Sequence, residues 1–329
     1  MASLKIGILG ASKIAPMALI APAKANNSVS LHGIAARDPA RAKAFAATHG
    51  IAHAHDSYAA LIADPAIDLV YNSLPPKHHL EWTLAALRSG KHVLLEKPSG
   101  MNAAEARTMV DAAREAGRRL IEAFHYRYHP LFARVLDIAR IELGALQSAE
   151  ASFEVPIANK PDEIRYDAGL GGGALMDLGC YPIQWLRNVA GGEPDVLEAS
   201  QTREAGGADI ATTARMRFPN RLHATLSCSM QPASGRPMAS LTVRGANGEM
   251  TVLNPLAPQF GHLLTWKRTG EPERQETFPQ RPTYDYQLEA VVDAIANGTA
   301  VPTEGNDIVN TMRVIDAVKS AAQKGVRNA

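Results

Sequence analysis

A lysine at the end of a short apolar run is the first residue whose position suggests chemistry. Residues 92–98 read His-Val-Leu-Leu-Glu-Lys-Pro, so the run ends in Glu96 and Lys97. The run is typical of a buried strand, and open α/β sheets bind ligands at the carboxyl ends of their strands. The following proline cannot continue a strand and would fix the local turn. We therefore expect Lys97 at a ligand-binding edge; the alternative is an exposed strand-end residue paired with Glu96.

A carboxylate and a phenol form the second candidate pair. Residues 171–181 begin with three glycines and lead into a predicted helix that carries Asp177 and Tyr181. Because these two residues are four apart, they would share one helix face. The alternative is that Tyr181 is a half-buried aromatic residue and Asp177 a helix cap.

A small-residue turn after the first apolar run predicts a dinucleotide site. Residues 7–15 read Gly-Ile-Leu-Gly-Ala-Ser-Lys-Ile-Ala, where a strand should turn into a helix. Free backbone N–H groups and the helix dipole can bind a pyrophosphate there. Against the pattern G-x-G-x-x-G, Gly10 fits the first glycine, while Ser12 and Ala15 replace the others. The alternative is an ordinary strand-to-helix turn. The predicted cofactor-binding residues here are Gly10, Ser12, Lys13 and Ile14.

The end of the second strand bears on which cofactor is used. An acid there would bind the ribose 2′-hydroxyl of NAD, whereas an arginine can pair with the 2′-phosphate of NADP. Ala36 takes the place of the acid, and Arg37 follows. The pattern favours NADP and leaves NAD use open. Asp38 could be a turn or N-cap residue before Pro39, or could itself reach the ribose.

Two kinds of element pattern divide the chain. Up to residue 124, apolar runs at 6–9, 31–35, 68–71, 92–95 and 120–124 alternate with helical stretches. This alternation predicts an α/β fold, a Rossmann-type doubly wound parallel sheet, in an NADP-binding domain at 1–124. Asn102 as N-cap, Glu105 and the later Gly117 bound one of its helices.

Consecutive strands follow in the second part of the chain. Strand-like segments at 146–155, 209–218, 222–230, 239–245 and 249–253 have no helices between them. They predict an α+β domain with a large, open, mostly antiparallel sheet at 125–329, which would serve substrate binding and oligomerisation. Two helices, from 284 to about 297 and from 307 to about 324, close the chain.

Composition excludes several classes of protein. A chain of 329 residues suits two domains, and 34 Lys and Arg residues balance 33 Asp and Glu residues. Without an excess positive field we expect no nucleic-acid partner and no anionic membrane partner. No apolar run is long enough for a membrane span, and a strand pattern from Leu4 leaves no signal peptide. Cys180 and Cys228 are not clustered, so we expect reduced thiols in a cytoplasmic protein.

Two histidines raise the question of a metal. His125 and His129 are four residues apart, and Glu122 is close. The segment straddles a strand end, where this spacing does not bring side chains together. We therefore expect no metal site.

The order and spacing of these motifs resemble one known family over nearly the whole chain. The Glu96-Lys97 strand end, the segment 171–181, a Pro-Pro-Lys-His-His turn at 75–79 and the closing segments around 287–288 and 311–315 are similar to those of the glucose-fructose oxidoreductase, inositol dehydrogenase and MocA family (Gfo/Idh/MocA). Inositol dehydrogenase-like members often have histidine where Tyr181 stands. The tyrosine makes the chain more similar to the dihydrodiol dehydrogenase-like branch.

The resemblance implies roles for the candidate residues. Lys97 would lie beside the nicotinamide and the substrate, Tyr181 would donate or accept a proton, and Asp177 would orient the substrate and the lysine. Alcohol oxidation needs a base at the hydroxyl while the cofactor takes the hydride. An ammonium group such as that of Lys97 would favour the phenolate that this requires. Further residues implied for cofactor binding are Ser73, Leu74, His79, Glu96 and Lys97 itself, and for the substrate Tyr126 and Arg127, whose alternative is interdomain packing.

The resemblance also implies an activity. It is reversible hydride transfer between NADP(H) and a hydroxyl or carbonyl carbon of a small-molecule carbohydrate, a polyol or a cyclic diol. The alternative is a non-catalytic dinucleotide-binding sensor of the same fold, against which the retention of the three catalytic candidates argues. A homodimer or homotetramer, formed through the exposed sheet face, is expected on the same ground.

Overall fold

The computed structural model describes residues 3–204 and 207–327, with side chains described up to residue 324. Compactness divides the chain into two units: Met1–His125 with Tyr284–Val309, and Tyr126–Thr283 with Asn310–Ala329. The sequence-based division gave every residue after 124 to the second domain. The structure differs because the segment that begins at Tyr284 packs its apolar side, including Leu288 and Val291, into the core of the first unit.

The first unit is built on a parallel six-stranded sheet with the strand order β3-β2-β1-β4-β5-β6, as the alternating pattern predicts. The order reverses beside β1, which is where open α/β sheets form their ligand-binding crevice. Strand β3 was not predicted, because His-Ala-His is too short and too polar to show as an apolar run. The strands are β1 (Leu4–Leu9), β2 (Val29–Ala35), β3 (His53–His55), β4 (Leu69–Asn72), β5 (His92–Leu95) and β6 (Leu120–Glu122).

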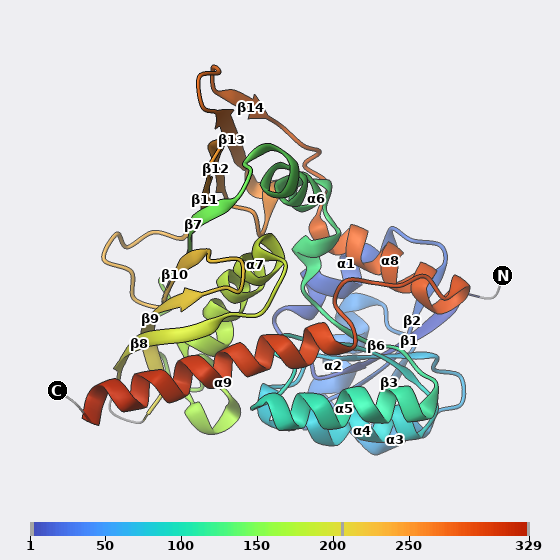
Figure 1. The fold of residues 1–329 in the computed structure, drawn as a ribbon. Coiled ribbons are helices and arrows are strands. Elements are labelled where there is room, and N and C mark those ends of the chain that lie inside the picture. The colour runs from blue at the N-terminus through green and yellow to red at the C-terminus, as the bar shows by residue number, and fades with distance from the viewer. Residues whose placement is uncertain (1–2, 205–206, 328–329) are drawn as a thin grey trace. The chain divides into compact units, whose positions relative to one another are not determined.

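Helices cover both faces of this sheet (Figure 1). α1, α2 and α8 pack on one face, where their alanines and aliphatic residues join the strands in one core, and α3, α4 and α5 lie on the other. α5 begins and ends as predicted, since the Asn102 side chain accepts a hydrogen bond from Glu105 N at 3.0 Å and Gly117 is left-handed at the C-cap. The helical elements are η1 (Pro16–Ile20), α1 (Ala21–Lys24), α2 (Pro39–His49), α3 (Tyr58–Ala63), η2 (Pro76–His78), α4 (His79–Arg88), α5 (Ala103–Ala116) and α8 (Thr283–Asn297), and η3 (His125–Tyr128) begins at the last residue of this part of the chain and otherwise belongs to the second unit.

The second unit contains an eight-stranded sheet with the order β14-β13-β12-β11-β7-β10-β9-β8. Only the β7–β10 pair is parallel among the described strands of this sheet, so the mostly antiparallel prediction is confirmed. The strands are β7 (Leu146–Glu154), β8 (Asp195–Arg203), β9 (Asp209–Arg217), β10 (His223–Ser229), β11 (Met238–Gly245), β12 (Gly248–Leu253), β13 (Leu263–Arg268) and β14 (Arg274–Glu276). The helical elements are α6 (Pro130–Asp137), η4 (Ile138–Glu142), η5 (Ile164–Tyr166), η6 (Ala168–Leu170), η7 (Leu175–Gly179), α7 (Cys180–Ala190), η8 (Pro258–Phe260) and α9 (Asn306–Arg327).

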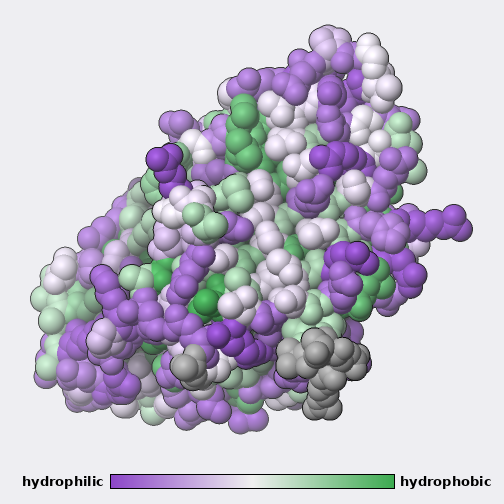
Figure 2. All heavy atoms as spheres, turned by 90° about the vertical axis from the view of Figure 1, so that its left-hand side faces the viewer, coloured by the Kyte–Doolittle hydropathy of each residue, from purple (hydrophilic) through white to green (hydrophobic). Residues whose placement is uncertain are grey.

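The two faces of this sheet differ in chemistry. One face buries Ala149, Ala151 and Leu226, and α7 packs against β7 and β10. The other face is polar: Figure 2, seen from the side on which β8 to β11 lie in Figure 1, shows mostly hydrophilic and intermediate residues with small separate hydrophobic patches. Exposed ion pairs cross this face at Arg244–Glu150 (2.8 Å), Lys267–Glu249 (2.9 Å) and Arg215–Glu198 (3.0 Å).

Candidate active site

The turn after β1 brings three of the predicted cofactor residues together. Gly10 has φ +96°, and a Cβ there would lie 3.1 Å from Leu74 Cδ2 and 3.4 Å from Ser73 Oγ. The Ser73 hydroxyl donates to Leu9 O at 2.9 Å, which fastens the end of β4 to the end of β1. The Ser12 hydroxyl accepts from Ala15 N at 3.3 Å at the start of the following helix. The backbone at Gly10 is therefore left bare by necessity, because a side chain there would be strained and crowded.

The end of β2 carries the residues predicted to read the ribose substituent. Asp38 Oδ1 accepts from Ala40 N at 2.9 Å and caps α2, so the capping alternative for Asp38 holds. Arg37 is exposed beside it. The Arg41 guanidinium donates from Nη2 to Ala11 O at 2.8 Å, which brings a second cation to the turn after β1. Sequence reasoning missed Arg41, because its contact with Ala11 joins residues that are 30 positions apart.

The end of β5 holds Glu96 and Lys97 in a mostly buried setting. Tyr71 OH, from β4, donates to Glu96 Oε1 at 2.6 Å. Tyr71 is fully buried, and burial together with the Glu96 charge raises the pKa of its phenol well above the usual value. Burial and the same charge also raise the pKa of Tyr284. Lys97 is partly buried, and the Lys97–Pro98 peptide is cis. The glutamate is thus fixed by the neighbouring strand, next to the predicted catalytic lysine.

Two buried histidines complete this end of the first unit. His79 places Nε2 2.7 Å from Leu74 O and Nδ1 3.0 Å from Pro98 O, which links the ends of β4 and β5. Burial lowers the pKa of His79 to about 4. The His125 ring lies 4.0 Å from the Tyr284 ring, and burial, aided by the Lys97 charge, lowers the pKa of His125 to about 3. Both imidazoles are therefore neutral at physiological pH.

These histidines predict a stability that falls on acidification. Their pKa values in the folded state, about 4 and about 3, lie below the unfolded value, so the unfolded chain binds more protons as pH drops below about 6.5. At pH 5 each histidine should lower the free energy of unfolding by roughly 2 kcal/mol relative to its value at about pH 7.5. Urea unfolding at the two pH values measures this loss. On going from about pH 7.5 to pH 5, His79→Asn should lose less unfolding free energy than the wild type. His78→Asn, which changes the exposed neighbour, should lose as much as the wild type. Equal losses in all three proteins would contradict the role of His79.

In the second unit, Asp177 and Tyr181 lie in consecutive helical turns. Asp177 belongs to η7, which is π-helical, and Tyr181 to the first turn of α7, so the predicted helix is present but its first part is wider than an α-helix. Tyr181 is 6% exposed, with its ring edge-on to Phe153 at 5.5 Å and 6.1 Å from Tyr126. Asp177 Oδ2 accepts from Arg165 Nε at 2.7 Å. Asp177 is therefore no helix cap, and it is held by an arginine that sequence reasoning missed.

The two predicted substrate residues lie in different surroundings. Tyr126 is buried among rings, edge-on to Phe132 at 4.8 Å and to Trp185 at 6.1 Å. Arg127 is partly buried, with its guanidinium carbon 5.2 Å from the centre of the Phe132 ring. Tyr126 thus shares one aromatic cluster with Tyr181, and Arg127 lies on the edge of that cluster.

His129 has a structural task in the second unit. Its Nδ1 accepts from Leu131 N at 3.1 Å at the start of α6, and its Nε2 lies 3.0 Å from Pro279 O. In the stretches 3–204 and 207–327, no three His, Cys, Asp or Glu side chains are placed to hold a metal ion. Within the same stretches, no helix combines the length and the hydropathy that a membrane crossing requires.

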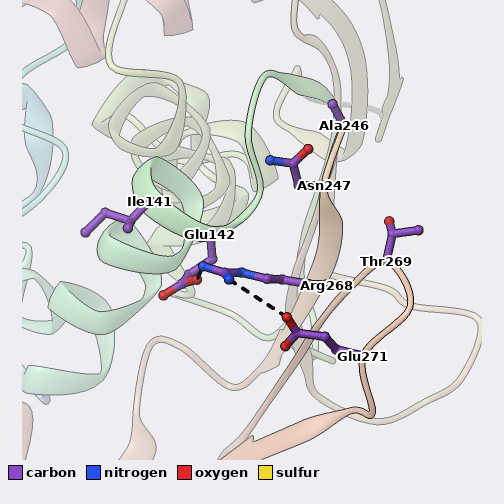
Figure 3. A pocket seen from close by; sticks show the side chains of 7 residues that line it. All are labelled: Ile141, Glu142, Ala246, Asn247, Arg268, Thr269 and Glu271. Carbon is purple, nitrogen blue, oxygen red and sulfur yellow. Dashed lines mark hydrogen bonds and ion pairs between the residues drawn. The ribbon is translucent and has the colours of Figure 1, made fainter.

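A pocket of about 380 Å³ also opens in the second unit, at the end of η4 and the turn between β11 and β12 (Figure 3). Arg268 forms ion pairs there with Glu142 and, at 3.8 Å, with Glu271. The two carboxylates neutralise this arginine. None of the residues that line the pocket is a predicted site residue; they are Ile141, Glu142, Ala246, Asn247, Arg268, Thr269 and Glu271.

The first unit, with its parallel sheet, bare glycine turn and reversed strand order, is typical of a dinucleotide-binding Rossmann fold. Residues 4–124 match the model of the oxidoreductase family with an NAD-binding Rossmann fold, and residues 138–251 match the GFO/IDH/MocA C-terminal domain. The chain belongs to the Gfo/Idh/MocA family of oxidoreductases.

Several known proteins are similar over most of their length. The NADP(+)-dependent D-xylose 1-dehydrogenase 2 of Haloferax volcanii is 34% identical over 97% of both chains. The trans-1,2-dihydrobenzene-1,2-diol dehydrogenase of Macaca fuscata fuscata is 35% identical over 68% of this chain and 66% of its own. The crystal structure of KijD10, a 3-ketoreductase from Actinomadura kijaniata in complex with NADP and TDP-benzene, superposes with a TM-score of 0.89 at 27% identity, over 97% of this chain and 98% of that one.

Proposed function

We propose that the protein transfers a hydride reversibly between NADP(H) and a hydroxyl or carbonyl carbon of a sugar, a polyol or a cyclic diol. The observation that carries this proposal is the gathering of the Gly10 turn, Arg37 with Arg41, and Lys97 at the carboxyl ends of β1, β2 and β5 in one parallel sheet. The named relatives support it, since one is an NADP(+)-dependent sugar dehydrogenase and another a diol dehydrogenase.

The residues of the first unit fit a dinucleotide with a 2′-phosphate. The bare backbone at Gly10, in the turn that leads from β1 to the helical segment beginning at Pro16, suits a pyrophosphate. Arg37 is exposed and available to a phosphate, and Arg41 lies against the same turn. The carboxylate of Asp38, which could have bound a ribose hydroxyl, already caps α2. Ser12, Lys13, Ile14, Ser73, Leu74, His79 and Glu96 are the further residues that we assign to cofactor binding.

In the proposed mechanism the nicotinamide would accept or donate the hydride, and side chains of the protein bind and release the hydroxyl proton. Tyr181 takes the hydroxyl proton during oxidation and returns it during reduction. Because its ring is buried among aromatic side chains, a phenolate there needs a nearby positive charge, which we assign to Lys97. Asp177 accepts a hydrogen bond from the substrate and so orients it, and Tyr126 and Arg127 are assigned to substrate contacts.

A paired assay tests the function. Fluorescence titration of the purified protein with NADPH and with NADH gives the two affinities, and absorbance at the nicotinamide band reports turnover of sugars, polyols and trans-diols. We expect NADPH to bind more tightly and at least one compound of these classes to be oxidised. Tight binding without turnover on a broad panel would favour the sensor alternative, and tighter binding of NADH would contradict the assignment of Arg37.

Arg37→Ala should weaken NADPH binding selectively. Charge-assisted hydrogen bonds are each worth about 1.5–3 kcal/mol, so we expect the Kd for NADPH to rise roughly 10- to 100-fold while the Kd for NADH stays the same. Arg41→Ala should weaken both cofactors, because it also removes the hydrogen bond to Ala11 O. Arg114→Ala, which removes an exposed arginine of α5, is the matched control. A parallel loss for both cofactors in Arg37→Ala would refute 2′-phosphate recognition.

We also propose that the chain forms a homodimer or homotetramer through the polar open face of the eight-stranded sheet. The ion pairs that cross this face can be exchanged for pairs between copies. Light scattering on the purified protein measures the mass of the assembly in solution. Charge reversal at Arg244 should shift that mass toward the mass of one chain.

A further inference from the structure

The side chain of Arg165 lies between two carboxylates in the second unit. Its Nε donates to Asp177 Oδ2 at 2.7 Å, and its Nη1 donates to Glu163 Oε1 at 2.9 Å. Glu163 also accepts from Arg165 N at 3.4 Å, at the start of η5. One guanidinium is thus held from both sides, and one of its two partners is the carboxylate that we assign to substrate orientation.

The backbone, and not the side chain alone, sets the position of Arg165 relative to Asp177. Gly173 N donates to Arg165 O at 2.8 Å, and Asp177 N donates to Gly173 O at 2.9 Å. A Cβ at Gly172 would lie 2.5 Å from Ile164 O and 2.6 Å from Arg165 O. The η5 backbone therefore lies directly on the glycines, and the same glycines lead into the helical turn that carries Asp177. This accounts physically for the glycine run, which allows the arginine segment to dock.

The ion pair is too exposed to be explained by stability. The side chains of Arg165 and Asp177 are 41% and 23% exposed, and pairs in such settings contribute little to the unfolding free energy. Their charges are nevertheless linked, since the Asp177 carboxylate, ahead of Glu163, raises the pKa of the Arg165 guanidinium. Such coupling is reciprocal, so the guanidinium favours the ionised form of Asp177 by the same interaction.

We propose that Arg165 is a positioning residue for the reaction, which holds Asp177 as an anion in one orientation and is itself held by Glu163. The proposal rests on the proposed function, because it takes Asp177 as the residue that orients the substrate. A carboxylate held in this way accepts the substrate hydrogen bond without a loss of side-chain freedom at each turnover. A neutral Asp177 would accept that hydrogen bond more weakly, and a freely rotating one would hold it in no fixed orientation.

Direct titration of Asp177 tests the charge link without any substrate. The protein is labelled with aspartate that carries ¹³C at the side-chain carboxyl, and the Asp177 signal is assigned by its loss in Asp177→Asn. We expect the midpoint of the Asp177 titration to rise by about one pH unit in Arg165→Gln and by less in Arg165→Lys, which keeps the charge. Arg114→Gln, an equal change on the exposed face of α5, should leave it where it is. An unchanged midpoint in Arg165→Gln would overturn the inference.

Kinetics test the consequence for the reaction. In Arg165→Gln, kcat/KM should fall roughly 10- to 100-fold and the acid limb of its pH profile should move upward by a similar pH shift, with NADPH affinity unchanged. Arg165→Lys should restore the acid limb but only part of the rate, because a lysine cannot bind both carboxylates as the planar guanidinium does. Full activity and an unmoved acid limb in Arg165→Gln would also overturn the inference. A wild type that turns over no substrate, together with a shifted Asp177 titration, would refute the proposed function and still support the hold of Arg165 on Asp177.

Discussion

Lys97→Met is expected to lower kcat by about a thousandfold, within the range of roughly 10²–10⁴ that acid–base groups contribute. The methionine keeps the length of the side chain and removes the charge that we assign to the phenolate of Tyr181. NADPH affinity should fall far less than kcat, because the turn at Gly10 and the two arginines near β2 are untouched. Tyr181→Phe, which keeps the ring among Phe153 and Tyr126, should lower kcat to a comparable degree. Stopped-flow and steady-state rates with the best substrate measure both effects.

A second lysine provides the matched control for that experiment. Lys91 is 7% exposed and donates from Nζ to Asp64 O at 2.8 Å and to Ile67 O at 2.7 Å. Lys91→Met should therefore destabilise the fold by about 1–3 kcal/mol, since two carbonyls lose their donor, while kcat stays unchanged. Wild-type turnover in Lys97→Met, or an equal loss of kcat in both lysine variants, would show that the charge of Lys97 has no special part in the chemistry.

Gly172→Ala should lower both the stability of the fold and its activity. The added methyl group would meet backbone atoms of Ile164 and Arg165 at 2.5–2.8 Å, and backbone cannot turn aside as a flexible side chain can. We expect a loss of roughly 2–4 kcal/mol in unfolding free energy, measured by urea denaturation, together with a fall in activity as Arg165 is pushed from Asp177.

Gly191→Ala separates this clash from simple backbone strain. Gly191 has φ +68°, and a Cβ added there would meet nothing within 4 Å, so its replacement should cost only about 1 kcal/mol. A loss in Gly172→Ala that is no greater than in Gly191→Ala would mean that η5 can move away from the glycines without penalty.

The sequence predicts those parts of the molecule that depend on local patterns. The helix between Asn102 and Gly117 is recognised by its caps, and the strand before Glu96 and Lys97 by its apolar run, because both signals lie within a few residues. The contacts of Asp177 with Arg165 and of Ala11 with Arg41 join residues that are 12 and 30 positions apart, and no local pattern announces them.

The place of α8 was missed for a related reason. Its amphipathic pattern shows that one side is buried but not which core receives it. In the structure, that side enters the core of the first unit through Leu288 and Val291. Which core buries this side of α8 depends on the shape of each core and on the apolar surface that the sheet leaves uncovered. A local stretch of sequence contains neither.

The parallel pairing of β7 with β10 has a consequence for how the second unit assembles. Strand neighbours such as Ser148 and His223 cannot meet by a hairpin, so the whole connection between them, with the glycine run, Asp177, Tyr181 and α7, must cross over before the sheet can close. Pairing between segments so far apart in the chain costs much chain entropy, because a long loop must close. Such pairs therefore form late in folding. The segment to which we assign Asp177 and Tyr181 therefore lies in the connection that must be in place before β7 and β10 can pair, so we expect this pair to form after the local hairpins of the same sheet.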